Sequence, residues 1–77
     1  MEAPNEVMHG LEVGDMVEVN THSQTFTVTN VMFDGEMIDI EGPRGGAKAL
    51  VENVKSGSVA VMNGKSKEGT VTEINVR

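Results

Sequence analysis

The two histidines are the residues of this sequence best suited to proton transfer near neutral pH or to metal binding through the imidazole ring. His9 and His22 both fall in or beside segments without a regular strand pattern, and Glu12 and Asp15 follow His9 closely. With these carboxylates a weak metal site is conceivable. The chain has no cysteine and no His-x-x-x-His spacing, so no motif enforces such a site. We expect two exposed histidines, no metal and no cofactor.

Paired carboxylates and serines are the other groups that could do chemistry. Asp39 and Glu41 stand two residues apart, and such pairs hydrolyse glycosidic bonds when a cleft separates them and raises the pKa of one. Charges at alternate positions are, however, the ordinary solvent-facing side of a half-buried strand. Ser58 lies in Gly57-Ser58-Val59, which lacks the Gly-x-Ser-x-Gly elbow of a serine nucleophile. The sequence therefore predicts a protein that is not an enzyme.

The segment from Gly42 to Lys48 combines a glycine-rich backbone with two basic side chains, Arg44 and Lys48. Backbone of this kind with an adjacent base can cradle an anion. The segment lacks the Gly-Lys-Ser/Thr ending of a nucleotide-binding loop, and no helix pattern follows it. We interpret it as a wide turn between two strands. The alternative is a loop that contacts an anionic or acidic partner.

Charge is divided unevenly between the two halves of the chain. Residues 1–42 contain nine acidic residues and no Lys or Arg, whereas residues 43–77 contain all six bases and three acids. The halves thus carry −9 and +3, which sum to the net charge of −6. Such asymmetry indicates an interaction surface. The alternative is that both sets are solvated faces whose opposite charges attract each other and help the fold to close.

The bases define the candidate partner-binding residues: Arg44, Lys48, Lys65 and Lys67. They lie in or next to glycine-containing loops, where binding residues commonly collect, and we expect them to be exposed. Two functions are consistent with this pattern. The first is a protein-interaction module with an unknown protein partner or an anionic partner, present as a monomer or a weak homodimer. The alternative is RNA or DNA binding, although a net charge of −6 and the absence of Trp and Tyr oppose it.

The elements that must position these residues are short strands separated by turns. Apolar residues alternate with polar ones, glycine recurs, and no window has helical spacing between caps. We expect a flexible N-terminal tail over residues 1–10 and a single domain over residues 11–77. Residues 65–69 are expected to form a polar, basic loop. The predicted fold is an all-β, five- or six-stranded, strongly bent antiparallel barrel. Strands are expected over residues 16–20, 25–33, 37–41, 47–54, 58–62 and 70–76.

One of these strands changes phase. Phe26 and Val28 share one parity, whereas Val31 and Phe33 share the other. A regular strand cannot bury both pairs, so the sequence predicts a bulge near residues 29–30 and four buried side chains. Asp34-Gly35 then predicts a hairpin turn.

Size and hydropathy limit the class of protein further. The chain has 77 residues, and its apolar runs are too short to span a membrane. Its first residues include acids rather than a basic region followed by an apolar stretch, so we expect no export signal. The expectation is a cytoplasmic domain that makes no membrane contact. Its core must be built largely from valine, because only two aromatic residues are present.

Two stretches carry a resemblance to known proteins. Leu-Glu-Val-Gly-Asp-Met-Val-Glu-Val at 11–19 resembles the opening strand of SH3-like small barrels, the group that includes KOW and Tudor-type modules. The stretch Ile-Glu-Gly-Pro-Arg-Gly-Gly-Ala-Lys-Ala-Leu-Val at 40–51, with Ser-Gly-Ser-Val at 56–59, is similar to uncharacterised small acidic domains of halophilic archaea. The resemblance implies an SH3-like barrel and assigns no role to any single residue.

Overall fold

The structure is a computed structural model that describes residues 3–77, and it confirms the predicted all-β antiparallel class. Every strand pairing within these residues is antiparallel. None of their helices is long and apolar enough to cross a membrane. In chain order the elements are α1 (Pro4–His9), β1 (Met16–Val19), β2 (Thr25–Met32), the 3-10 turn η1 (Phe33–Gly35), β3 (Met37–Glu41), β4 (Ala47–Glu52), β5 (Val59–Asn63), β6 (Ser66–Val71) and β7 (Ile74–Val76).

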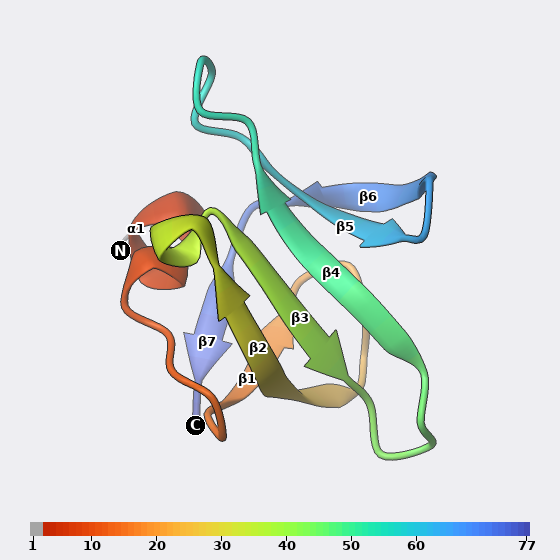
Figure 1. Ribbon diagram of the computed structural model, residues 1–77. Coiled ribbons are helices and arrows are strands. Elements are labelled where there is room, and N and C mark those ends of the chain that lie inside the picture. Colours follow the sequence, from red (N-terminus) through yellow and green to blue (C-terminus); the bar gives the residue numbers. More distant parts are fainter. Residues whose placement is uncertain (1–2) are drawn as a thin grey trace.

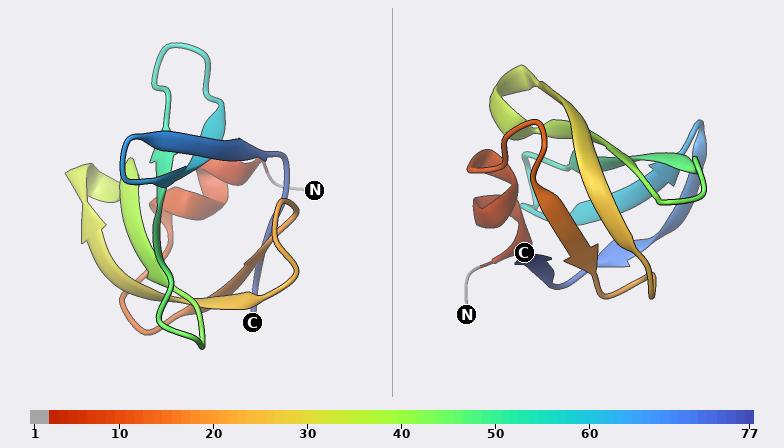
Figure 2. Two further views of the ribbon diagram at one scale, coloured as in Figure 1. Left: turned by 90° about the vertical axis from the view of Figure 1, so that its right-hand side faces the viewer. Right: turned by 90° about the horizontal axis from the view of Figure 1, so that it is seen from below.

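The strands form one sheet in the order β6-β5-β4-β3-β2-β1-β7, which curls into a half-barrel (Figures 1 and 2). Strands β1 to β6 form a meander, whereas β7 crosses to the opposite edge and pairs with β1. The side-chain oxygen of Asn20 accepts hydrogen bonds from the backbone N–H groups of Thr72 and Glu73 at 2.8 and 3.2 Å. These bonds tie the end of β1 to the link between the two edge strands.

The sheet has seven strands, so the predicted number of five or six is wrong. Residues 65–69, expected as a basic loop, lie mostly in β6. An edge strand needs no apolar alternation, because much of it faces solvent and charged side chains there discourage pairing with other chains. The charged residues Lys67 and Glu68 therefore give β6 a sequence pattern that does not predict a strand. The last predicted strand, over 70–76, is divided between β6 and β7.

The phase change in β2 is a bulge, as predicted. The register between β2 and β3 shifts between Val28 and Asn30, the extra residue being Thr29. Beyond the shift Val31 pairs with Ile38, and it packs against the core as a partly buried side chain. The bulge thus returns the apolar side chains of both halves of β2 to the inner face.

Phe33 is 71% exposed, so the prediction that it is buried is wrong. Strand β2 ends one residue earlier, and Phe33, Asp34 and Gly35 all have positive φ values of 53°, 55° and 93°. This left-handed turn directs the aromatic ring away from the sheet. Positive φ is uncommon for a bulky residue, so the turn must be held by its surroundings. A Cβ on Gly35 would lie 2.9 Å from the Cα of His9, which shows how closely the turn packs against α1.

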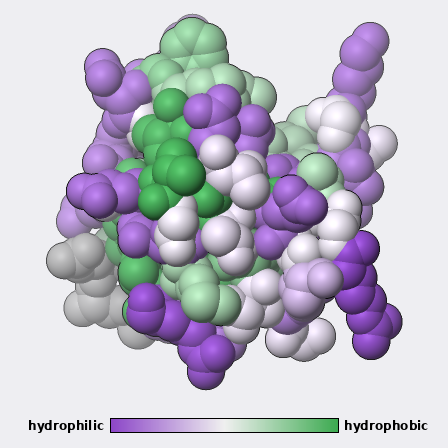
Figure 3. All heavy atoms as spheres, turned by 60° about the horizontal axis from the view of Figure 1, so that its bottom comes forward, coloured by the Kyte–Doolittle hydropathy of each residue, from purple (hydrophilic) through white to green (hydrophobic). Residues whose placement is uncertain are grey.

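The core fills the inner face of the curled sheet. Its largest fully buried side chains include Phe26, Met8 and Leu50, and no polar or charged residue among 3–77 is classed as buried. Apolar side chains also reach the surface, and the face in Figure 3 shows a small apolar group bordered by hydrophilic ones. The core comprises Met8, Leu11, Val17, Val19, Phe26, Val28, Ile38, Ile40, Leu50, Val59, Val61, Val71 and Ile74.

Residues 4–9 form α1, so the tail predicted over residues 1–10 is wrong for this part; residues 1–2 lie outside the described residues. Six residues are too few to hold a helix by themselves. Pro4 favours a helix start because its missing N–H needs no partner in the first turn. Met8 is completely buried and anchors the helix in the core. Tertiary contact therefore creates this element.

Candidate interaction surface

The four predicted partner-binding residues have different surroundings. Arg44 is exposed in the turn between β3 and β4, Lys65 is exposed in the two-residue turn between β5 and β6, and Lys67 is exposed on β6. Lys48 lies near the start of β4, where its side chain is only 13% exposed. Its backbone partner is the inward-facing Ile40, so Lys48 projects toward the interior side of the sheet. The expectation of four exposed bases holds for three of them.

Lys48 belongs to a small ionic cluster with Glu68 and His22. The Lys48 Nζ atom lies 2.6 Å from Glu68 Oε1, and His22 Nε2 lies 3.3 Å from the same oxygen. The hydrogen bond from Lys48 lowers the pKa of Glu68, and a hydrogen bond from Asn63 lowers it further. The charge of Lys48 is therefore neutralised within the chain. Sequence reasoning missed this pairing because Glu68 sits in the unrecognised strand β6.

Arg44 borders a polar hollow beside this cluster. The hollow has a volume of about 380 Å³ and is lined by His22, Ser23, Gln24, Pro43 and Arg44. The turn after β3 is closed by its own backbone, with the N–H of Gly42 donating to Gly46 and that of Gly45 donating to Gly42. Two of its N–H groups are thus used internally. This favours the interpretation of the segment as a wide turn over that of an anion cradle.

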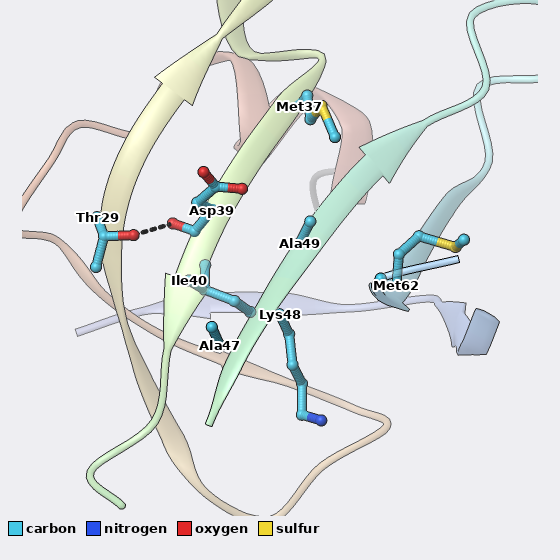
Figure 4. Close-up of a pocket in the computed structure, with 9 residues that line it drawn as sticks. Thr29, Met37, Asp39, Ile40, Ala47, Lys48, Ala49 and Met62 are labelled. Atoms are coloured by element: carbon cyan, nitrogen blue, oxygen red, sulfur yellow. Dashed lines mark hydrogen bonds between the residues drawn. The ribbon is translucent and has the colours of Figure 1, made fainter. Parts of the chain in front are cut away.

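The outer face of β3, β4 and β5 carries a second hollow, which is more apolar. It has a volume of about 380 Å³ and lies over Ala47 and Ala49, with Met37 and Met62 on either side (Figure 4). Asp39 projects at its border, where Thr29 donates a hydrogen bond to the Asp39 carbonyl oxygen at 3.3 Å. Small side chains between two methionines produce the depression. Methionine is flexible and adapts its shape to a contacting surface.

Four residues in the middle of this outer face form one row across four strands. Asp39 of β3 pairs with Ala49 of β4, Ala49 pairs with Met62 of β5, and Met62 pairs with Lys67 of β6. Directly paired residues share a face of the sheet. The row is therefore an acid, a small residue, a large apolar residue and a base, side by side. Alternation along single strands reveals the outward positions, but only the register aligns them.

The opposite end of β4 carries a histidine cluster that involves α1. His9 donates from Nδ1 to the Asp34 carbonyl oxygen at 2.8 Å and from Nε2 to Glu52 Oε1 at 2.7 Å. Both partners are acceptors, so the two hydrogen bonds form together when both ring nitrogens carry protons, as in the imidazolium. The hydrogen bond to Asp34, followed by that to Glu52, raises the pKa of His9. Asn5 donates to the other Glu52 oxygen at 3.2 Å.

These contacts give the histidines structural partners rather than a shared site. Each histidine is bound to a different glutamate, Glu52 or Glu68. Within residues 3–77 no three His, Asp or Glu side chains are grouped as metal ligands would be. Comparison of the chain with protein-family models, curated proteins and solved structures gives no match. The surface geometry itself must therefore support any functional proposal.

Proposed function

We propose that this protein is a non-enzymatic interaction module that binds another protein through the outer face of β3, β4 and β5. The observation that supports the proposal is the hollow over Ala47 and Ala49, which is apolar, solvent-open and bounded by charged residues. Apolar contact flanked by charges of both signs suits a protein surface, because the charges set orientation while the apolar area supplies affinity. We also propose that the fold is of the SH3-like barrel type. The strong curl of the sheet and the pairing of β7 with β1 support this.

RNA or DNA binding is the second candidate. Exposed Arg44, Lys65 and Lys67 support it, and the exposed ring of Phe33 adds a stacking surface. Arg44 and Phe33 lie beyond opposite ends of β3, which spans about 17 Å at the usual rise per residue. Asp34 and Glu36 follow Phe33 closely in sequence and repel phosphate. This separation favours a protein partner.

The test uses immobilised protein and a lysate of the source organism. Ala49→Arg places a long charged side chain in the hollow, whereas Val54→Arg adds the same charge at a 67% exposed site in the β4–β5 loop. We expect a protein that is retained by the wild type and by Val54→Arg and lost with Ala49→Arg, and that binds again when purified. Equal retention by both variants contradicts the proposal.

A parallel titration with single-stranded oligonucleotides separates the two candidates. We expect no saturable binding at low salt. Binding that weakens steeply with salt and is lost in Lys65→Glu/Lys67→Glu would instead support the nucleic-acid function.

A further inference from the structure

One row of side chains on the outer face, Asp39, Ala49, Met62 and Lys67, is complementary to a second copy of itself in which the order is reversed. Read from β3 to β6 the order is acid, small, large, base. A half-turn about an axis that lies in the interface plane, between β4 and β5 and parallel to them, reverses this order in the facing copy. The base of one copy then lies over the acid of the other, and the methionine of each lies over the alanine of the other.

From this match we propose that the partner of this face is a second copy of the chain, in a two-fold symmetric homodimer. Met62 of each copy enters the hollow over Ala49 of the other, and Asp39 pairs with Lys67 across the interface at two equivalent places. An isologous contact of this kind requires a surface that complements itself, which the row provides. This inference rests on the proposed function, because it uses the same face.

The charges of the row are available for such contacts. Among residues 3–77, neither Asp39 nor Lys67 takes part in an ion pair, whereas Lys48 is paired with Glu68. Neighbouring strands lie about 4.8 Å apart, so the row extends over about 14 Å. Three residues of the row, Asp39, Ala49 and Met62, line the hollow.

The net charge limits the strength of the dimer. Each copy carries −6, so the two bodies repel each other while the two Asp39–Lys67 pairs attract. We therefore expect a weak dimer whose population depends on protein concentration and increases when moderate salt screens the long-range repulsion.

Sedimentation equilibrium on charge-reversed variants tests the proposal. Lys67→Glu places like charges at both contacts of its homodimer, and so does Asp39→Lys. Each variant should weaken self-association about tenfold or more. An equimolar mixture places opposite charges at both contacts of the mixed dimer. The mixture should regain association close to that of the wild type.

Two matched substitutions control for net charge. Lys55→Glu and Glu12→Lys reverse the same types of charge at exposed positions outside the row, and both should leave the dimer unchanged. The proposal is overturned if the wild type stays monomeric at millimolar concentration, if Lys55→Glu acts as strongly as Lys67→Glu, or if mixing restores nothing. A monomeric wild type that still retains a different protein, with loss in Ala49→Arg, would overturn this inference alone and leave the proposed function standing.

Discussion

Strand β4 carries an ionic contact near each of its ends, and the two contacts differ in the cation. At the α1 end, the Glu52 side chain is 7% exposed and binds His9. At the other end, the Glu68 side chain of β6 is 29% exposed and binds Lys48. A histidine loses its charge near neutral pH, whereas a lysine ammonium ordinarily keeps it. The docking of α1 is thus sensitive to pH in the neutral range.

The largest expected effect tests how much the α1 end depends on packing. Met8→Ala removes a completely buried side chain and should lower the free energy of unfolding by about 2–5 kcal/mol. Met16→Ala is the matched control, because Met16 is 46% exposed, and it should change stability little. Urea denaturation followed by circular dichroism measures both. Equal effects of the two substitutions would show that α1 is not docked as described.

The next comparison removes the charge of each glutamate while keeping its shape. Glu52→Gln weakens the acceptor of both His9 and Asn5 at a well-covered position, and we expect a loss of about 1–3 kcal/mol in unfolding free energy. Glu68→Gln should cost less, because Glu68 is more exposed and solvent replaces part of what is lost. The same denaturation measurement ranks the two variants. A larger loss of unfolding free energy for Glu68→Gln would show that the contact at the Lys48 end stabilises the fold more than the contact at the α1 end.

Raising the pH through the neutral range should weaken the α1 end. The folded protein raises the pKa of His9 above 6.5, so its stabilisation is complete below pH 6.5 and is lost as the pH rises through the raised value. The melting temperature should therefore fall on going from mildly acidic to mildly alkaline conditions. His9→Gln should flatten this fall, whereas Glu68→Gln should retain it. An NMR titration of the His9 ring that shows no upward shift would contradict the described hydrogen bonds.

The smallest expected effect appears at acidic pH and belongs to the Lys48 end. The pKa of Glu68 is lowered from 4.5, so its stabilisation is complete above pH 4.5 and is lost as the pH falls through the lowered value. Lys48→Met keeps the aliphatic stem and removes the charge. This variant should lose stability near neutral pH and differ less from the wild type in strong acid. A difference that does not change with pH would indicate a packing role for Lys48.

Much of the sheet could be predicted from local patterns. Alternation identified β3 and the inward positions of Ile38 and Ile40, both of which are buried. The parity conflict in β2 located the bulge, because two apolar faces of opposite phase cannot both be buried by a regular strand. The same reasoning failed for Phe33, since it assumed that the strand continued one residue further. A left-handed turn held against α1 decides that position.

The candidate surface was predictable only in part. Three bases are exposed as expected, but the charge pattern could not show that Lys48 meets Glu68, because that contact joins β4 to a strand that resembles a loop in sequence. The row from Asp39 to Lys67 was also beyond sequence reasoning. Its alignment depends on the register of three strand pairs and on the shift between Val61 and Met62.

By itself the sequence determined that this chain is an antiparallel β protein, which side of β3 faces inward, and where β2 bends. These properties follow from period-two alternation and turn residues, which act over a few neighbouring positions. Only the tertiary structure decided that residues 4–9 are helical, that Phe33 is exposed, and that Asp39, Ala49, Met62 and Lys67 share one row. The physical reason is that each of these outcomes depends on contacts between segments far apart in the chain, which no local pattern encodes.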